Sequence, residues 1–210
     1  MALTSYSELK SSIADWLNRD DLTAVIPDFI ALAEAQMERR LPTQKMVKRA
    51  NATIDTPFSA LPSDFLSLKS LILTSTSPVK QLVFLSQDEM DAKKTIYSPT
   101  GKPQYFALVG NQIEVLPAPD TGYTAEITYI ATLAKLSDTN TSNWVLARHP
   151  DVYLYGSLLQ AAPYLRDDER VGLWSSQYQA AIEDMLLQNE RAAFSQGRTA
   201  MTVKPTRVIA

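Results

Sequence analysis

The sequence predicts an α+β protein: a helical bundle of about four to five helices with an inserted antiparallel β meander of four to five strands. Apolar residues recur at helical spacing near both ends of the chain, and they alternate with polar residues in the middle. Gly110-Asn111 separates two runs rich in β-formers, as in a hairpin. At 45% hydrophobic and 20% charged residues over 210 positions, the composition is that of a folded protein with a sizeable core.

Two helices are expected within the first 41 residues. Ser5 and Glu8 have the spacing of a capping box, in which the two side chains bond to the backbone at the helix start. The apolar residues that follow at helical spacing are Tyr6, Leu9, Ile13, Trp16 and Leu17. Pro27 suits the first turn of a second helix, and Pro42 ends it. This helix carries a stripe of Phe29, Ile30, Ala33, Met37 and Leu41.

The middle of the chain reads as strands. Residues 43–62 show little periodicity and are expected to be a connector, whereas strands are expected from residue 66 to residue 132. Ser86 and Glu89 form a second capping box, which predicts a short helix to about Lys94. The hairpin pairs residues 105–109 with residues 113–116, and residues 123–132 alternate as a half-buried strand does.

The C-terminal part should return to helices. Asn143 to Arg148 predicts a short helix, and Pro150 starts a longer one that Pro163 kinks or ends. Asp167 or Asp168 is expected to cap the last helix. The stripe of that helix is Val171, Trp174, Tyr178, Ile182 and Met185.

Four segments follow from this pattern. They are an N-terminal helical pair with its connector (1–65), a β insert (66–135), C-terminal helices that complete the bundle (136–197) and an extended C-terminal arm (198–210). The arm has basic and β-branched residues, no acidic residue and no helical period, so it cannot bury itself. It is either a frayed tail or an arm that docks on another chain.

Catalytic chemistry is not evident in the residues. The chain has no cysteine and one histidine, which excludes thiol nucleophiles, disulfides and Cys/His metal sites and fits a reducing cytoplasm. His149 stands at a helix start, where capping or packing is the favoured interpretation. The acidic pairs at 20–21, 88–89 and 167–168 are interpreted as helix caps. We therefore expect no enzyme, no cofactor and no metal.

Membrane and leader segments are also not expected. The N-terminus has neither a basic region nor an apolar one of the kind found in signal peptides. The longest nearly uncharged apolar run, Val152 to Leu165, is too short to cross a bilayer. The net charge of −3 gives no general attraction to nucleic acid or to an anionic membrane.

Two features of the sequence each have two interpretations. Five basic residues fall between positions 39 and 49 with no acid among them: Arg39, Arg40, Lys45, Lys48 and Arg49. They are either a contact patch for an anion or partner, or the solvated end of a helix, where cations are favoured by the helix dipole. The aromatic residues of the last two helices could stack on bases, but their helical spacing favours core packing or a subunit interface.

The chain resembles the head-to-tail adaptor proteins of short-tailed and related phages, the SU-ten-type adaptor family. The similar stretches are residues 6–41, 60–73 and 105–191, which hold the helix pair, an LP-x-DFL entry to the strands, an LP-x-P after the hairpin and an HPD that leads into long helices. The resemblance implies a structural virion protein at the head–tail junction, made in the host cytoplasm. It also implies a ring of twelve copies that docks on the portal, extends the DNA channel and carries tail or nozzle proteins.

In such adaptors an extended C-terminal arm reaches onto the portal. By location and character this implies a portal contact through Arg198, Val203, Lys204, Pro205, Arg207, Val208 and Ile209. Duplex DNA would pass through the channel without specific binding, and no membrane is involved. Two rivals stay open: a DNA-binding module that uses the basic residues 39–49, and a small enzyme with its site in the β insert.

Overall fold

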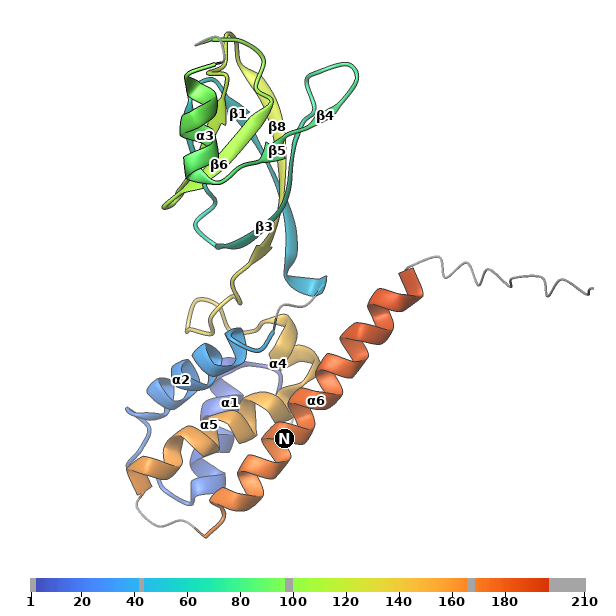
Figure 1. The fold of residues 1–210 in the computed structure, drawn as a ribbon. Coiled ribbons are helices and arrows are strands. Elements are labelled where there is room, and N and C mark those ends of the chain that lie inside the picture. Colours follow the sequence, from blue (N-terminus) through green and yellow to red (C-terminus); the bar gives the residue numbers. More distant parts are fainter. Residues whose placement is uncertain (1–2, 42–43, 97–99, 166–168, 197–210) are drawn as a thin grey trace, which may run out of the picture. The chain divides into compact units, whose positions relative to one another are not determined.

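The computed structural model (Figure 1) describes residues 3–41, 44–96, 100–165 and 169–196. The chain forms two compact units. The helical unit comprises the segments up to Gln44 and from Leu133 onward, and the β unit comprises Lys45–Thr132. Because the described residues form six α-helices and two four-stranded sheets, the predicted α+β class is confirmed.

In its described residues the helical unit has five helices, which bury their apolar faces on one another. They are α1 (Tyr6–Leu17), α2 (Ile26–Glu38), α4 (Trp144–Arg148), α5 (Pro150–Leu165) and α6 (Val171–Gln196). α5 lies at the centre and packs against α1, α2, α4 and α6. Its Val152, Tyr153 and Leu158 are buried together with Trp174 and Tyr178 of α6. The two ends of the chain therefore build one core, and the β unit is an insertion between them.

Local sequence signals account for the helix starts. Ser5 Oγ accepts from the Glu8 backbone N–H at 3.3 Å, and Glu8 Oε2 accepts from the Ser5 N–H at 3.0 Å, so the predicted capping box is present. Pro27 lies in the first turn of α2, where its missing N–H leaves no bond unmade. Pro163 lies in the last turn of α5, two residues before that helix ends. The expected caps Asp167 and Asp168 fall outside the described residues.

The β unit contains two sheets and one α-helix in its described residues. A 3-10 turn (Gln44–Met46) leads into it from the helical unit. Its further elements are β1 (Val47–Ile54), β2 (Phe58–Ala60), β3 (Phe65–Leu73), β4 (Lys80–Gln81), β5 (Val83–Phe84), α3 (Gln87–Lys94), β6 (Tyr105–Val109), β7 (Gln112–Leu116) and β8 (Tyr123–Ala131). The strand orders are β1-β8-β3-β4 and β2-β7-β6-β5. Among these strands the pairing of β5 with β6 is parallel and the other pairings are antiparallel.

One core joins the two sheets. Leu71, Leu73 and Ile127 from the first sheet are buried in the same cluster as Phe106 and Val115 from the second. The helix α3 starts at the predicted second capping box and buries Met90 against β6. The predicted hairpin is also present, with Gly110 in the left-handed region at φ 58° between β6 and β7, a conformation that glycine adopts without strain.

The β unit is larger than the predicted meander of four to five strands, since the described residues form eight strands. The strands β1 and β2 lie within residues 43–62, which the sequence pattern assigns to a connector. The physical reason is that β1 is the edge strand of its sheet, and only Ile54 of its eight residues is buried. An edge strand that is mostly exposed shows no clear alternation of apolar and polar residues.

Candidate interaction surfaces

The helical unit is held together by a buried polar network. Glu34 on α2 is a buried glutamate, with 3% of the residue exposed. Its Oε1 accepts from the Leu136 backbone N–H at 2.8 Å and from the Tyr153 hydroxyl at 2.9 Å, and the Asn143 side-chain amide donates to that hydroxyl at 2.6 Å. Burial raises the pKa of Glu34, although these hydrogen bonds oppose the shift. Burial, and next the Glu34 charge, raises the pKa of Tyr153.

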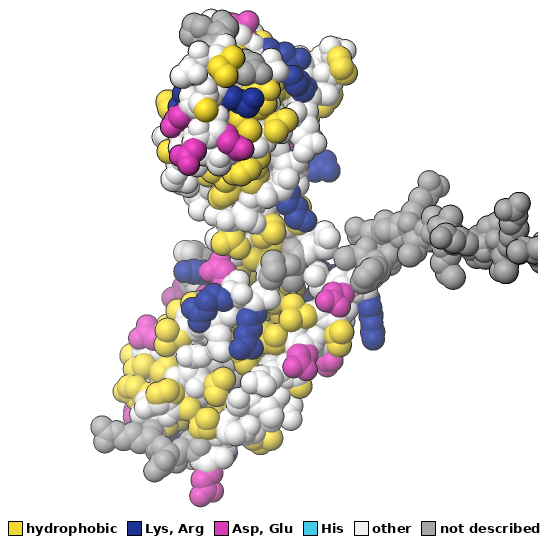
Figure 2. Space-filling view, viewed as in Figure 1, with side chains coloured by type: hydrophobic (Ala, Val, Ile, Leu, Met, Phe, Trp, Pro, Cys, Tyr) yellow, Lys and Arg dark blue, Asp and Glu magenta, His cyan; other side chains and the backbone are white. Residues whose placement is uncertain are grey.

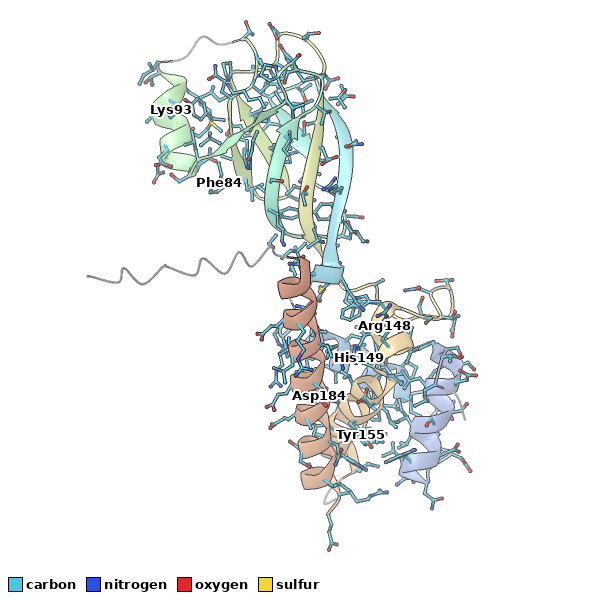
Figure 3. All side chains as sticks on the ribbon, turned by 90° about the vertical axis from the view of Figure 1, so that its right-hand side faces the viewer. Phe84, Lys93, Arg148, His149, Tyr155 and Asp184 are labelled. Carbon is cyan, nitrogen blue, oxygen red and sulfur yellow. The ribbon has the colours of Figure 1, made fainter. Side chains whose placement is uncertain are left out.

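The single histidine has a structural setting. His149 is the C-cap of α4, its backbone N–H donates to the Val145 carbonyl at 2.7 Å, and its ring meets the Trp144 ring edge-on at 6.5 Å (Figure 3). His149 also directly precedes Pro150, the first residue of α5, so it stands at a helix start as expected, and in addition it ends α4. Within the described ranges, no group of three or more His, Asp or Glu residues is placed to hold a metal ion.

The basic residues 39–49 divide between the two units. Arg39 is the C-cap of α2 and is followed by the exposed Arg40, whereas Lys45, Lys48 and Arg49 belong to the β unit. Lys48 Nζ lies 2.7 Å from Asp64 Oδ2, and together with Tyr129 it holds the pKa of that carboxyl below its usual range.

Arg49 is also close to an acid, since its Nη1 lies 3.7 Å from Glu126 Oε1. Two of the five positive charges are therefore partly balanced within the β unit.

Most aromatic residues of the last two helices serve the core. Tyr153, Trp174 and Tyr178 are buried, which removes them as a stacking platform for bases. Tyr155 is half-buried and meets Trp16 of α1 edge-on at 5.8 Å, whereas the exposed Tyr164 meets Phe29 of α2 at the same distance. The buried rings therefore pack in the core, which is one of the two roles that their helical spacing favours.

Exposed apolar side chains occur on both units (Figure 2). On the β unit, Phe84 is 56% exposed (Figure 3), and it borders a surface groove of about 380 Å³. The groove is lined by residues of β3, β4, β5 and β6, among them Leu68, Leu82, Phe106 and Leu108. On the helical unit, Leu32 of α2 and Leu173 and Leu187 of α6 each expose half or more of their surface. Such side chains are typical anchors of protein–protein contacts.

The residues predicted to form the portal arm, Arg198, Val203, Lys204, Pro205, Arg207, Val208 and Ile209, lie outside the described residues. What the structure places directly before them is α6, which runs to Gln196. No helix within the described ranges is long and apolar enough to cross a membrane.

The model of the SU10 adaptor protein family matches residues 4–203, which is nearly the whole chain. The chain belongs to the SU10 adaptor protein family. This membership gives it a structural role as a phage head–tail adaptor, places it at the head–tail junction of the virion and makes portal and tail proteins its general class of partners. The family is one of structural adaptors, not of enzymes. A search of curated proteins finds no match.

The resemblance predicted from the sequence is thereby confirmed. The matched range includes both units of the adaptor and extends into the predicted arm. Sequence reasoning found the buried faces of α1, α2 and α6, except that Trp16 of the α1 stripe is 45% exposed. It did not identify Glu34 as a buried carboxylate. A glutamate within the alanine-rich stretch of α2 carries no signal in the sequence that separates it from a solvated one.

Proposed function

We propose that this adaptor is the subunit of a ring of twelve copies that docks on the portal, extends the DNA channel and provides the attachment surface for tail or nozzle proteins. The family match over residues 4–203 carries the proposal. The organisation of the chain supports it, because a structural adaptor needs a rigid body and separate surfaces for different partners. The helical unit has such a body around α5, and the β unit exposes its own apolar groove.

In this proposal the C-terminal arm contacts the portal. Residues 197–210 follow directly on α6 and carry Arg198, Lys204 and Arg207 without any acidic residue. A segment of this length could reach at most about 50 Å when extended, which is enough to cross onto a neighbouring protein.

The test is a chain that ends at Gln196, compared with the full chain for binding to purified portal. We expect the shortened adaptor to keep the tryptophan fluorescence of the folded protein and to lose at least about tenfold in portal affinity. A full-length variant with Lys204 and Arg207 both changed to alanine keeps the length of the chain and removes two of the predicted contacts, so it should also lose portal affinity, though less than the shortened chain. Full portal affinity in the shortened chain would refute the arm contact.

The DNA-binding alternative predicts salt-dependent retention on duplex DNA through residues 39–49. The ion pairs of Lys48 with Asp64 and of Arg49 with Glu126 reduce the positive charge available for phosphates, and the net charge of the chain is −3. We therefore favour a channel that DNA passes without specific binding. Retention on DNA at physiological salt, lost when Arg39 and Arg40 are changed to alanine, would favour the rival.

A further inference from the structure

Two exposed helix faces of the helical unit have matching patterns. On α2 the outward row is Asp28, Leu32, Ala35 and Arg39, and on α6 it is Ala180, Asp184, Leu187 and Arg191 (Figure 3 labels Asp184). Both rows have the spacing i, i+4, i+7, i+11, which keeps their members on one face of a helix. Each row is about 16 Å long at 1.5 Å per residue.

Both faces are exposed to solvent in the described residues. Leu32 is 53% exposed and Leu187 is 50% exposed. The α2 and α6 helices bury their other faces on α5, through Ala33 and Tyr178 among others. The four charged members of the rows make no ion pair within 4.0 Å with any described residue. The faces thus combine exposed leucines with charges that have no oppositely charged partner in the described part of the chain.

The two rows complement each other in one direction only. When they run antiparallel with Leu32 opposite Leu187, Asp28 falls opposite Arg191 and Ala35 opposite Asp184. Arg39, whose side chain leans back toward the N-terminus of its helix, then reaches Asp184 across the small Ala35. In the parallel alignment that keeps Leu32 opposite Leu187, Asp28 instead lies beside Glu183 and Asp184, which brings like charges together. Alanines at two of the positions allow the helices to approach closely.

We propose that the α2 row of one copy packs antiparallel on the α6 row of the next copy, so that a second copy of this chain is the partner of both faces. The proposal rests on the ring of the proposed function and names the surfaces that form it. Because the two faces differ and lie on different helices, the contact is heterologous, and each copy presents one free face after the other is occupied. Such a contact continues from copy to copy.

Cysteine cross-linking tests this contact, since the natural chain contains no cysteine. The full chain with Leu32→Cys and Leu187→Cys, assembled with its portal and treated with a short bis-maleimide, should give a ladder of covalent multimers. A mixture of the two single variants should stop at the covalent dimer. The matched control pairs Leu32→Cys with Leu173→Cys, which lies fourteen residues, about 21 Å, along α6 from Leu187 and should give no ladder.

Charge exchange tests the register independently. We expect Arg39→Glu and Asp184→Arg each to weaken assembly about tenfold, and the double variant to recover it to within about threefold, because the pair is restored with reversed signs. Arg40→Glu makes the same charge change one residue outside the row and should have little effect. Unchanged tryptophan fluorescence confirms that each variant is folded.

The outcomes separate this inference from the ring itself. If the unmodified adaptor forms multimers with its portal but the double-cysteine variant gives no ladder and the charge variants assemble normally, the α2–α6 contact is wrong and the ring stands. If the unmodified adaptor binds its portal without any contact between adaptor copies, both the contact and the proposed ring are overturned.

Discussion

The strongest test of the helical unit is the buried carboxylate of Glu34. Changing Glu34 to alanine leaves the Leu136 backbone N–H and the Tyr153 hydroxyl without their shared acceptor. A buried group that loses its hydrogen-bond partner costs about 1–3 kcal/mol. The variant loses two such hydrogen-bond partnerships, but it also avoids the free-energy cost of burying a carboxylate. We therefore expect the free energy of unfolding to fall by about 2–4 kcal/mol. That is a large part of the roughly 5–15 kcal/mol of a typical domain.

The conservative variant Glu34→Gln separates packing from charge. An amide oxygen in the place of Oε1 can still accept from Leu136 and Tyr153, so the loss should stay below about 1.5 kcal/mol near pH 4. Burial raises the pKa of Glu34 above the ordinary value of 4.5 in the folded state only. Between 4.5 and that raised pKa the unfolded chain therefore binds fewer protons than the folded one, and stability from this group falls as pH rises. The Glu34→Gln variant has no titrating group at this position and lacks this loss.

The assay is urea unfolding followed by tryptophan fluorescence at several pH values. All three tryptophans, Trp16, Trp144 and Trp174, lie in the helical unit, so their signal reports on that unit alone. We expect the stability of the glutamine variant relative to the natural protein to increase from pH 4 to pH 7. A relative stability that stays flat or decreases over this range would refute the argument that Glu34 is buried at a cost. Tyr153→Phe is the companion variant, since it removes one donor and leaves the carboxylate.

Two further predictions concern packing and helix starts. Gly156→Ala on α5 would place a methyl group 3.0 Å from Tyr178 Cε2, so we expect the free energy of unfolding in urea to fall by about 1–2 kcal/mol. Gly172→Ala on α6 is the control, since its added methyl has no packing neighbour within 4 Å, and it should be neutral or stabilising by about 0.5 kcal/mol. Equal effects of the two variants would contradict this packing. Ser5→Ala and Ser86→Ala each remove a capping box, which should lower the free energy of unfolding by about 1 kcal/mol. Only Ser5→Ala should shift the urea transition seen by tryptophan fluorescence, because the tryptophans lie in the helical unit. A shift with Ser86→Ala would show that the two units unfold together.

Features that depend on neighbouring residues could be predicted from the sequence. The two capping boxes, the Gly110 hairpin and the buried stripe of α2 are set by residues within a few positions of one another, and all are present. The alternation of residues 123–131 also matches the burial of β8. These signals are strong because β8 is a central strand with neighbours on both sides, and its inward face must be apolar.

Long-range pairing could not be predicted in the same way. The strand β1 pairs with β8, so that Val47 lies opposite Ile130 across more than eighty positions of sequence. Lys48 and Arg49, which stand out in the sequence as part of a basic run, lie on this strand and pair with acids from distant parts of the β unit. The leucines of α6 can likewise be read in the sequence. That Leu173 and Leu187 are exposed can be recognised only once it is known that α5 covers the opposite face of the helix.

The structure also explains how an insertion of this size is compatible with one helical core. Glu38 on α2 accepts from the Leu133 backbone N–H at 3.3 Å, and Glu34, one turn earlier, accepts from Leu136. The chain is therefore held by α2 at the point where it returns from the β unit. At the point where it leaves, the Gln44 backbone N–H donates to Asn189 Oδ1 of α6 at 3.1 Å. Both ends of the insertion are bonded within the helical unit, so the β strands can vary without loosening α2, α5 or α6.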